Sequence, residues 1–227
     1  MLNRAIELEP TYAPALAHAA ACYLAISDQG WKRLTSIEVA EGLRLARAAI
    51  QADMNDSVAL CLSGHTIASL TGDFNAGLAW IDRATRLNPS YAEGWMRSSM
   101  VRVYANDLGR AIEHSRRAIE LSPLDPKLYH PLCAQGYAYL FTNQFDEALR
   151  AGQEALMGQQ RPEMAYRISI TALIQLGRFE EVGAARADFL KEHPTFRISS
   201  WRHRSKFTAD SRFEMMESAL RQAGLPE

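Results

Sequence analysis

The sequence has few cysteines and no long apolar segment. Its three cysteines, Cys22, Cys61 and Cys133, lie far apart and form no Cys-x-x-Cys pair, which argues against a disulfide framework and a cysteine zinc site. No apolar run approaches the roughly 18 residues that a membrane-spanning helix needs, and no charged-then-apolar leader stands at the N-terminus. We therefore expect a cytoplasmic protein without disulfides.

The sequence also lacks an excess of charge of either sign. It contains 25 Lys and Arg against 26 Asp and Glu, for a net charge of −1, so no overall field attracts nucleic acid, an anionic membrane or an acidic substrate. The 48% hydrophobic and 22% charged content is that of a folded domain. We expect a protein or peptide partner that is recognised locally, and neither nucleic acid nor a membrane.

Motifs that carry catalysis are missing as well. There is no GxGxxG, phosphate loop, GxSxG elbow or HExxH helix. The histidines form no i, i+4 pair, and carboxylates such as Glu180 and Glu181 fall where solvated helix faces are expected. No nucleophile has a base and an orienting group near it in any recognisable pattern. The sequence predicts no catalytic residue, no metal site and no cofactor.

What the sequence does contain is an internal repeat. The segments AIELEP (5–10), ATRLNP (84–89) and AIELSP (118–123) share a small residue, a Leu and a closing Pro, and the last two lie 34 residues apart. Within such a unit, small side chains let two antiparallel helices approach closely. A single unit cannot bury its apolar faces alone, so several units must stack.

The residues between these segments match a known pattern. Trp95, Ala111, Ala118 and Pro123 stand at positions 4, 20, 27 and 32 of one unit, and this pattern resembles the tetratricopeptide repeat, TPR. The resemblance implies an all-α fold: a right-handed α-α superhelix of about five helix-turn-helix repeats. The expected organisation is a TPR array over 1–196, with a partial repeat 1–12 and full repeats 13–56, 57–91, 92–128, 129–162 and 163–196, then a basic linker and a C-terminal capping helix in 197–227.

Several positions depart from the pattern. About ten extra residues, near Ser27 to Ser36, separate the two helices of the first full repeat. Arg102 occupies position 11, where a large apolar residue is usual, and three residues replace Ala at position 20 or 27: Gly77, Val182 and Phe189. We expect local register shifts of one residue there. The capping helix is expected to begin at Thr208 or Asp210.

In a stacked TPR array the first helix of each repeat forms a concave wall. The predicted groove-facing residues are Glu93, Met96, Met100, Val103, Tyr104, His130, Cys133, Tyr137, Leu140, Phe141, Arg167 and Thr171. The groove is mostly apolar and lacks the Lys and Asn residues of the TPR clamp for chaperone tails. It suits an amphipathic helix or an extended peptide. The alternative is that the 197–213 segment fills it from within, through Phe196, Ile198, Trp201 and Phe207.

A second candidate site is the basic segment that follows the repeats. Arg197, Arg202, Arg204 and Lys206 lie close together in sequence, beside His203. They can bind an anion or an acidic segment, or form a solvated linker, and the sequence leaves both interpretations open.

The amino-acid sequence of the third and fourth repeats gives a closer resemblance. The stretch AIEHSRRAIELSPLDPKLYH, the later NQFDEAL and the ending ALRQAGLPE resemble the C-terminal TPR region of proteobacterial signalling proteins. In those proteins a class III adenylate/guanylate cyclase or a winged-helix domain precedes the array. This implies a non-catalytic regulatory scaffold. A stand-alone peptide-binding adaptor and an apolar small-molecule or acyl-chain sensor are the alternatives.

The first ten residues match only the end of a repeat. Ala5, Leu8 and Pro10 take positions 27, 30 and 32, so the helix that should pair with this one is not in the sequence. An edge of this kind leaves an apolar face of the first full repeat uncovered. We expect this N-terminal edge to bind an upstream repeat or a second copy of the chain.

Overall fold

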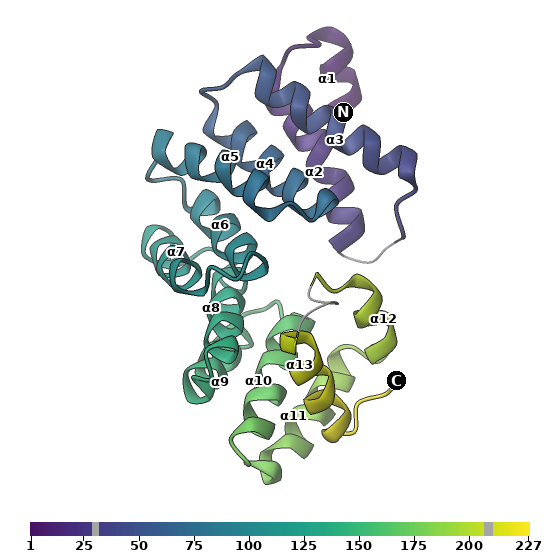
Figure 1. The fold of residues 1–227 in the computed structure, drawn as a ribbon, viewed down its shortest axis with the longest axis vertical. Helices are drawn as coiled ribbons and strands as arrows, with labels where there is room; N and C mark the ends of the chain where they lie inside the picture. Colours follow the sequence, from purple (N-terminus) through teal and green to yellow (C-terminus); the bar gives the residue numbers. More distant parts are fainter. Residues whose placement is uncertain (29–31, 207–210) are drawn as a thin grey trace. The chain divides into compact units, whose positions relative to one another are not determined.

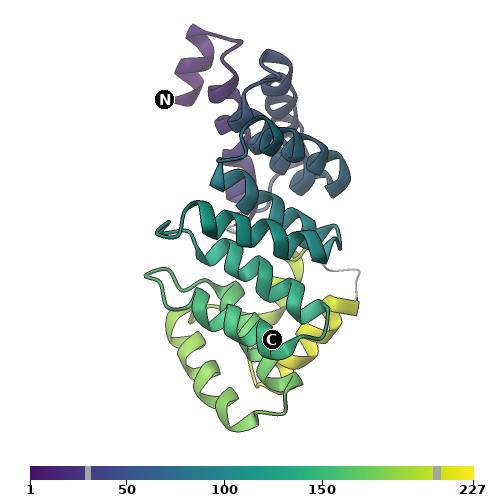
Figure 2. The ribbon, with the colours of Figure 1, turned by 90° about the vertical axis from the view of Figure 1, so that its left-hand side faces the viewer.

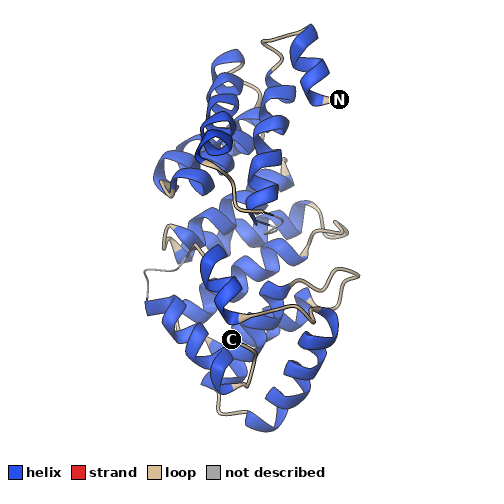
Figure 3. Ribbon diagram, turned by 90° about the vertical axis from the view of Figure 1, so that its right-hand side faces the viewer, coloured by secondary structure: helices blue, strands red, loops and turns tan. Residues whose placement is uncertain are grey.

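The structure is a computed structural model that describes residues 1–28, 32–206 and 211–227. Every regular element in these ranges is a helix, and Figure 3 shows no strand among them. The all-α prediction is confirmed. The chain divides into two compact units, Met1–Ala105 and Asn106–Glu227. We refer to them as unit 1 and unit 2. The boundary falls inside the third predicted repeat.

Unit 1 consists of antiparallel helices that pack in sequence order (Figure 1). Helix α2 packs against α3, and α4 packs against α5. The first helices of the pairs also pack against each other, α2 on α4 and α4 on α6, which is how stacked repeats bury their apolar faces. The helices are α1 (Leu2–Leu8), α2 (Ala13–Asp28), α3 (Ser36–Ala52), α4 (Ser57–Thr71), α5 (Phe74–Leu87) and α6 (Ala92–Tyr104).

The helices of unit 2 first pack in pairs, as those of unit 1 do, and the last two helices depart from this pairing. Helix α8 packs on α7 and α9, and α10 packs on α8, α9 and α11. Two further helices follow, and α13 packs on α10 (Figure 1). The segment expected to be a linker therefore contains a helix of its own, α12. The helices are α7 (Leu108–Leu121), α8 (Tyr129–Phe141), α9 (Phe145–Ala155), α10 (Glu163–Gln175), α11 (Phe179–Glu192), α12 (Ile198–Arg204) and α13 (Ser211–Gln222).

Local chemistry sets the helix ends. Gly72 ends α4 with a φ of 76°, a left-handed conformation that glycine adopts without steric cost. Asp73 then starts α5, because its side chain accepts a hydrogen bond from the backbone N–H of Ala76. Residues 29–31 of the predicted insertion, and the predicted caps Thr208 and Asp210, lie outside the described residues.

Two glycines allow α4 and α5 to approach closely. A Cβ atom at Gly77 would lie 2.5 Å from the Cβ of Ala68 and 2.5 Å from the carbonyl oxygen of Gly64. Both distances are far shorter than van der Waals contact. Position 20 of this repeat thus holds Gly because the neighbouring helix leaves no room for even a methyl group.

We expect Gly77→Val to lower the free energy of unfolding by about 2 kcal/mol, because the new side chain forces α5 away from α4. Urea unfolding followed by circular dichroism measures this change. Gly183→Ala is the matched control. It lies inside α11, where an added Cβ meets nothing within 4 Å, and should stabilise the helix by about 0.5–1 kcal/mol. Equal stability of Gly77→Val and the wild type would contradict the packing argument.

Candidate functional site

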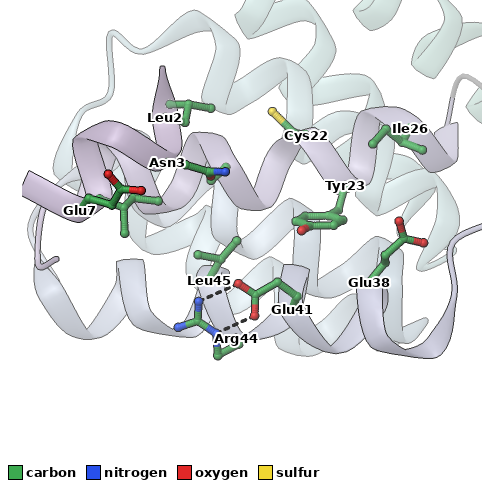
Figure 4. A pocket seen from close by; sticks show the side chains of 12 residues that line it. Leu2, Asn3, Glu7, Cys22, Tyr23, Ile26, Glu38, Glu41, Arg44 and Leu45 are labelled. Atoms are coloured by element: carbon green, nitrogen blue, oxygen red, sulfur yellow. Dashed lines mark hydrogen bonds and ion pairs between the residues drawn. The ribbon is translucent and has the colours of Figure 1, made fainter.

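An open groove lies in unit 1 between α1, α2 and α3, and we call it the N-terminal groove. Its cavity volume is about 640 Å³. Figure 4 shows side chains from all three helices along its border. Cys22 is exposed, whereas Tyr23 and Ile26 are half-buried. The lining residues are Leu2, Asn3, Ile6, Glu7, Ala19, Cys22, Tyr23, Ile26, Glu38, Glu41, Arg44 and Leu45.

Helix α1 lies at the N-terminal end of unit 1 (Figure 2) and is short. It has 7 residues, whereas the second helices α5 and α7 have 14 each. The sequence RAIEL at 4–8 recurs at 117–121, so α1 corresponds to the second half of α7. The groove borders the N-terminal end of α1 and the C-terminal half of α2, where the first half of an α7-like helix would lie.

Charged residues at the rim of the groove are paired. Arg44 donates two hydrogen bonds of 2.7 Å to Glu41, as Figure 4 shows, and Arg4 pairs with Glu7 at 2.9 Å. Hydrogen bonds from Lys32 and Thr35 lower the pKa of Glu38 to about 2. The rim is therefore locally neutral, and the apolar side chains are the part of the groove that a ligand can desolvate.

The predicted concave residues of unit 1 are only partly accessible. Met100 and Val103 are buried, at 7% and 0% exposure, whereas Glu93, Met96 and Tyr104 are half-buried. These five residues lie on α6. Their predicted role in binding stays a prediction.

Arg97 of α6 links α6 to α4. It donates hydrogen bonds of 3.0 and 2.6 Å to Glu93, and one of its nitrogens lies 2.9 Å from Nδ1 of His65. Beside these groups, burial raises the pKa of the Cys61 thiol to about 12. This cluster holds the two first helices together, while burial disfavours the thiolate form of Cys61.

The predicted groove residues of unit 2 are mostly buried. Two of them, His130 and Phe141, are half-buried. The rings of Tyr137 and Phe141 stack at 5.8 Å, and burial raises the pKa of Tyr137. The buried members are Cys133, Tyr137, Leu140, Arg167 and Thr171. Their predicted role in binding likewise stays a prediction.

The C-terminal segment covers this part of unit 2. Phe196, Ile198 and Trp201 are buried, at 2%, 0% and 4% exposure, and Trp201 stacks over Arg167 at 5.0 Å. Farther along, Arg212 lies over the ring of Phe141 at 5.1 Å. Filling from within the chain, one of the two possibilities that the sequence left open, is therefore what the structure shows here. Phe207 lies outside the described residues.

The predicted anion patch contains residues that already have partners. Arg202 forms an ion pair with the buried Glu217, and Arg204 lies 3.3 Å from Glu163. Arg197 donates a 2.7 Å hydrogen bond to the carbonyl oxygen of Phe196, while Lys206 is half-buried. Sequence reasoning missed Glu217, because a single Glu on an amphipathic helix gives no signal of burial. Binding of an anion to this patch stays a prediction.

Within the described ranges, no group of three or more His, Cys, Asp or Glu side chains is arranged to hold a metal ion. Among the same residues, no helix combines the length and the apolar character needed to cross a membrane.

Comparison with known proteins identifies the fold. No protein-family model matches the sequence, and no curated protein does. Among solved structures, PilW, a type IV pilus biogenesis factor, aligns with a TM-score of 0.69 and 12% identity over 92% of each chain. A tetratricopeptide repeat protein from Parabacteroides merdae aligns with a TM-score of 0.62 and 13% identity, over 98% of this chain and 83% of that one.

A third similar structure is YrrB, a TPR protein with an unusual peptide-binding site. It aligns with a TM-score of 0.53 and 17% identity, over 78% of this chain and 90% of its own. These similarities agree with the spacing of small residues along the sequence and with the paired antiparallel helices. The chain has the fold of tetratricopeptide repeat proteins.

Proposed function

We propose that the chain is a non-catalytic protein-interaction module, and that its N-terminal groove binds an amphipathic helix of a protein partner. The observation that carries the proposal is the incompletely buried apolar surface of α2 that lines the groove. Half-buried Tyr23 and Ile26 and exposed Cys22 form an apolar strip beside the end of a 7-residue helix. Such a strip gains free energy when a partner removes it from water.

A helix is the occupant that this surface fits. Elsewhere in the chain, a second helix packs on the first helix of the next pair: α3 on α4, α5 on α6, α7 on α8 and α9 on α10. The groove continues the α1–α2 interface along the same direction. A partner helix with a small or apolar stripe therefore meets α2 as α1 does. Its outer face can stay charged, as the outer faces of the other second helices are.

The comparisons and the resemblance support the same class of function. YrrB is a TPR protein with a peptide-binding site. The third and fourth repeats resemble the TPR region of bacterial signalling proteins, which supports a regulatory role inside a larger cytoplasmic protein, with a cyclase or winged-helix domain as the other part. In that setting the partner helix belongs to the signalling protein itself or to a second copy of it.

The test uses a fluorescein-labelled peptide of residues 108–121, because α7 ends in the same RAIEL as α1 and its first half corresponds to the helix segment that would lie in the groove. We expect the intact chain to bind the peptide in an anisotropy titration. Cys22→Arg and Ile26→Arg should each weaken binding by at least about tenfold, because a charge then stands on the apolar strip. Peptide binding should also protect the Cys22 thiol from alkylation.

His18→Arg is the matched control, because His18 is exposed on α2 but does not line the groove. Its affinity for the peptide should equal that of the wild type. If the peptide fails to bind, or if Cys22→Arg binds as well as His18→Arg, the groove is not the site. Concentration-dependent dimers that Cys22→Arg abolishes would identify a second copy of the chain as the partner.

A further inference from the structure

A buried arginine lies at the centre of the covered surface in unit 2. Arg167 of α10 is 6% exposed. Its guanidinium donates to Oε2 of Glu163 at 3.1 Å and to the hydroxyl of Tyr137 on α8 at 3.2 Å. The Trp201 ring of α12 covers it, with the guanidinium carbon 5.0 Å from the ring centroid. A buried cation of this kind is stable only with such partners.

Two polar groups on the surface that α12 covers lack a hydrogen-bond partner within the described part of the chain. The Nε of Arg167 and the hydroxyl of Thr171 are buried and have no hydrogen-bond partner among the residues that the structure describes. A buried donor without an acceptor costs free energy. The present occupant therefore supplies an aromatic ring but not the acceptors that the surface can use.

Helix α12 has the features of a bound peptide. Ile198, Trp201 and Arg204 recur every third residue and so share one face. Ile198 and Trp201 are buried, and Arg204 lies 3.3 Å from Glu163. The helix has only 7 residues and no side-chain N-cap. Because helices this short do not form alone in water, α12 depends on its docking for its structure.

We propose that α8 and α10 of unit 2 form a peptide-binding site in which α12 is an internal ligand. The partner that displaces it is a helix of another protein, with an aromatic residue followed three residues later by Arg or Lys. The aromatic ring replaces Trp201 on Arg167, and the cation replaces Arg204 at Glu163. An acceptor on the partner, such as an amide or carboxylate oxygen, can also reach the unpaired Nε, which gives the partner an advantage over α12.

Displacement has to break the contacts that hold α12 to the C-terminal end. The backbone N–H of Ile198 donates to the carbonyl oxygen of Pro226 at 2.9 Å, and the Nε of Arg202 donates to Glu217 at 2.8 Å. These contacts set a threshold, so only a partner that matches the site better than α12 does can enter. The site is thus closed to weak binders.

The experiment uses the full chain carrying Trp201→Ala and a fluorescein-labelled peptide of residues 196–206. The variant should bind the peptide at least about tenfold more tightly than the wild type does, because its own α12 no longer competes effectively. The same peptide with Ala in place of Trp is the specificity control. Phe179→Ala, an exposed position on α11, is the variant control and should behave like the wild type.

Thiol chemistry gives an independent measurement. Burial raises the pKa of both Cys133 and Cys61 to about 12, and Cys133 lies near Arg167. Cys133 should alkylate faster in Trp201→Ala than in the wild type, whereas Cys61 in unit 1 should not change. The exposed Cys22 reports the reagent's full activity.

Equal peptide affinity of the wild type and Trp201→Ala would overturn the proposal, and so would equally tight binding of the Trp-free peptide. If both Cys61 and Cys133 are alkylated in Trp201→Ala, the chain has unfolded. Arg204→Ala then takes its place, because it removes the contact to Glu163 and keeps the buried Trp201 ring. Arg204→Ala should then bind the peptide more tightly than the wild type, and an unchanged affinity would reject the site. Stable dimers of the wild type that Trp201→Ala abolishes would show that a second copy's α12 occupies the site instead, and would overturn the proposal.

Discussion

Replacing Phe189 with alanine is expected to lower the free energy of unfolding by about 4 kcal/mol, within the range for deleting a fully buried phenyl ring. Phe189 is 0% exposed. Its ring stacks on Tyr166 at a centroid distance of 4.9 Å and lies 4.6 Å from the ring of Phe196. The substitution therefore removes contacts to α10 and to the segment that leads into α12. Urea unfolding followed by circular dichroism measures the loss.

Phe179→Ala on the same helix is the control for this prediction. Phe179 is 58% exposed, and its loss should change the stability by less than about 0.5 kcal/mol. A similar effect of the two substitutions would show that Phe189 does not anchor the core of unit 2. Because Phe196 precedes α12, Phe189→Ala should also increase alkylation of Cys133.

Removal of Asp82 is the second substitution with a large expected effect. Asp82 of α5 accepts two hydrogen bonds from Arg102 of α6, at 2.7 and 2.8 Å, and the Arg102 side chain is 5% exposed. Asp82→Ala removes the carboxylate that accepts these two hydrogen bonds from the buried guanidinium. We expect a loss of about 3 kcal/mol, the lower end for a broken buried pair, because Asp82 itself is 30% exposed. Thermal and urea unfolding measure it.

Substitution of the other partner, Arg102, should lower the free energy of unfolding far less. Arg102→Leu restores the large apolar residue that position 11 usually holds, and it leaves Asp82 in contact with water. Replacing a buried charge by a well-packed apolar residue is often neutral, so the double variant Asp82→Ala/Arg102→Leu should recover most of the lost stability. If Arg102→Leu destabilises as much as Asp82→Ala, the pair contributes net stability and the argument from desolvation is wrong.

The helix pairs could be predicted because their signal is local and repeated. Ala84, Ala111 and Ala148, which stand at helix-contact positions of three repeats, are all 0% exposed. The first helices α4, α6 and α8 begin at Ser57, Ala92 and Tyr129, where the predicted repeats also start. Small residues at fixed spacing in a 3.6-residue period specify which faces meet, whatever lies farther along the chain.

The departures from the pattern needed the structure for their explanation. Gly77 lies against α4, where a larger residue would clash. Arg102 pairs with a carboxylate on α5. Phe189 packs against aromatic rings on α10 and after the end of α11. In each case the partner comes from another helix or from outside the repeat. A single position in the sequence carries no sign of what will lie opposite to it.

For the candidate sites, too, the sequence did not indicate which residues would lie opposite each other. The sequence placed Tyr137, Arg167 and Thr171 on one apolar surface, and the structure buries all three. The sequence left open whether the 197–213 segment covers this surface, and the structure shows that Trp201 lies over Arg167. An uncovered apolar face at the N-terminal edge was expected, but the residues that line it, such as Cys22, came from the structure. Both outcomes depend on α1, which matches only part of a repeat, and on α12, which lies outside the repeats, and the docking of both is decided by long-range packing.

The sequence by itself thus determined the helical repeat fold and the close contacts of its small residues, because these follow from periodicity and local sterics. Only the tertiary structure decided which surfaces remain available. Burial of an apolar face depends on whichever segment returns to cover it, and that choice depends on the shape and charge of residues distant in sequence, such as Glu163 beneath Arg204 and Glu217 beneath Arg202.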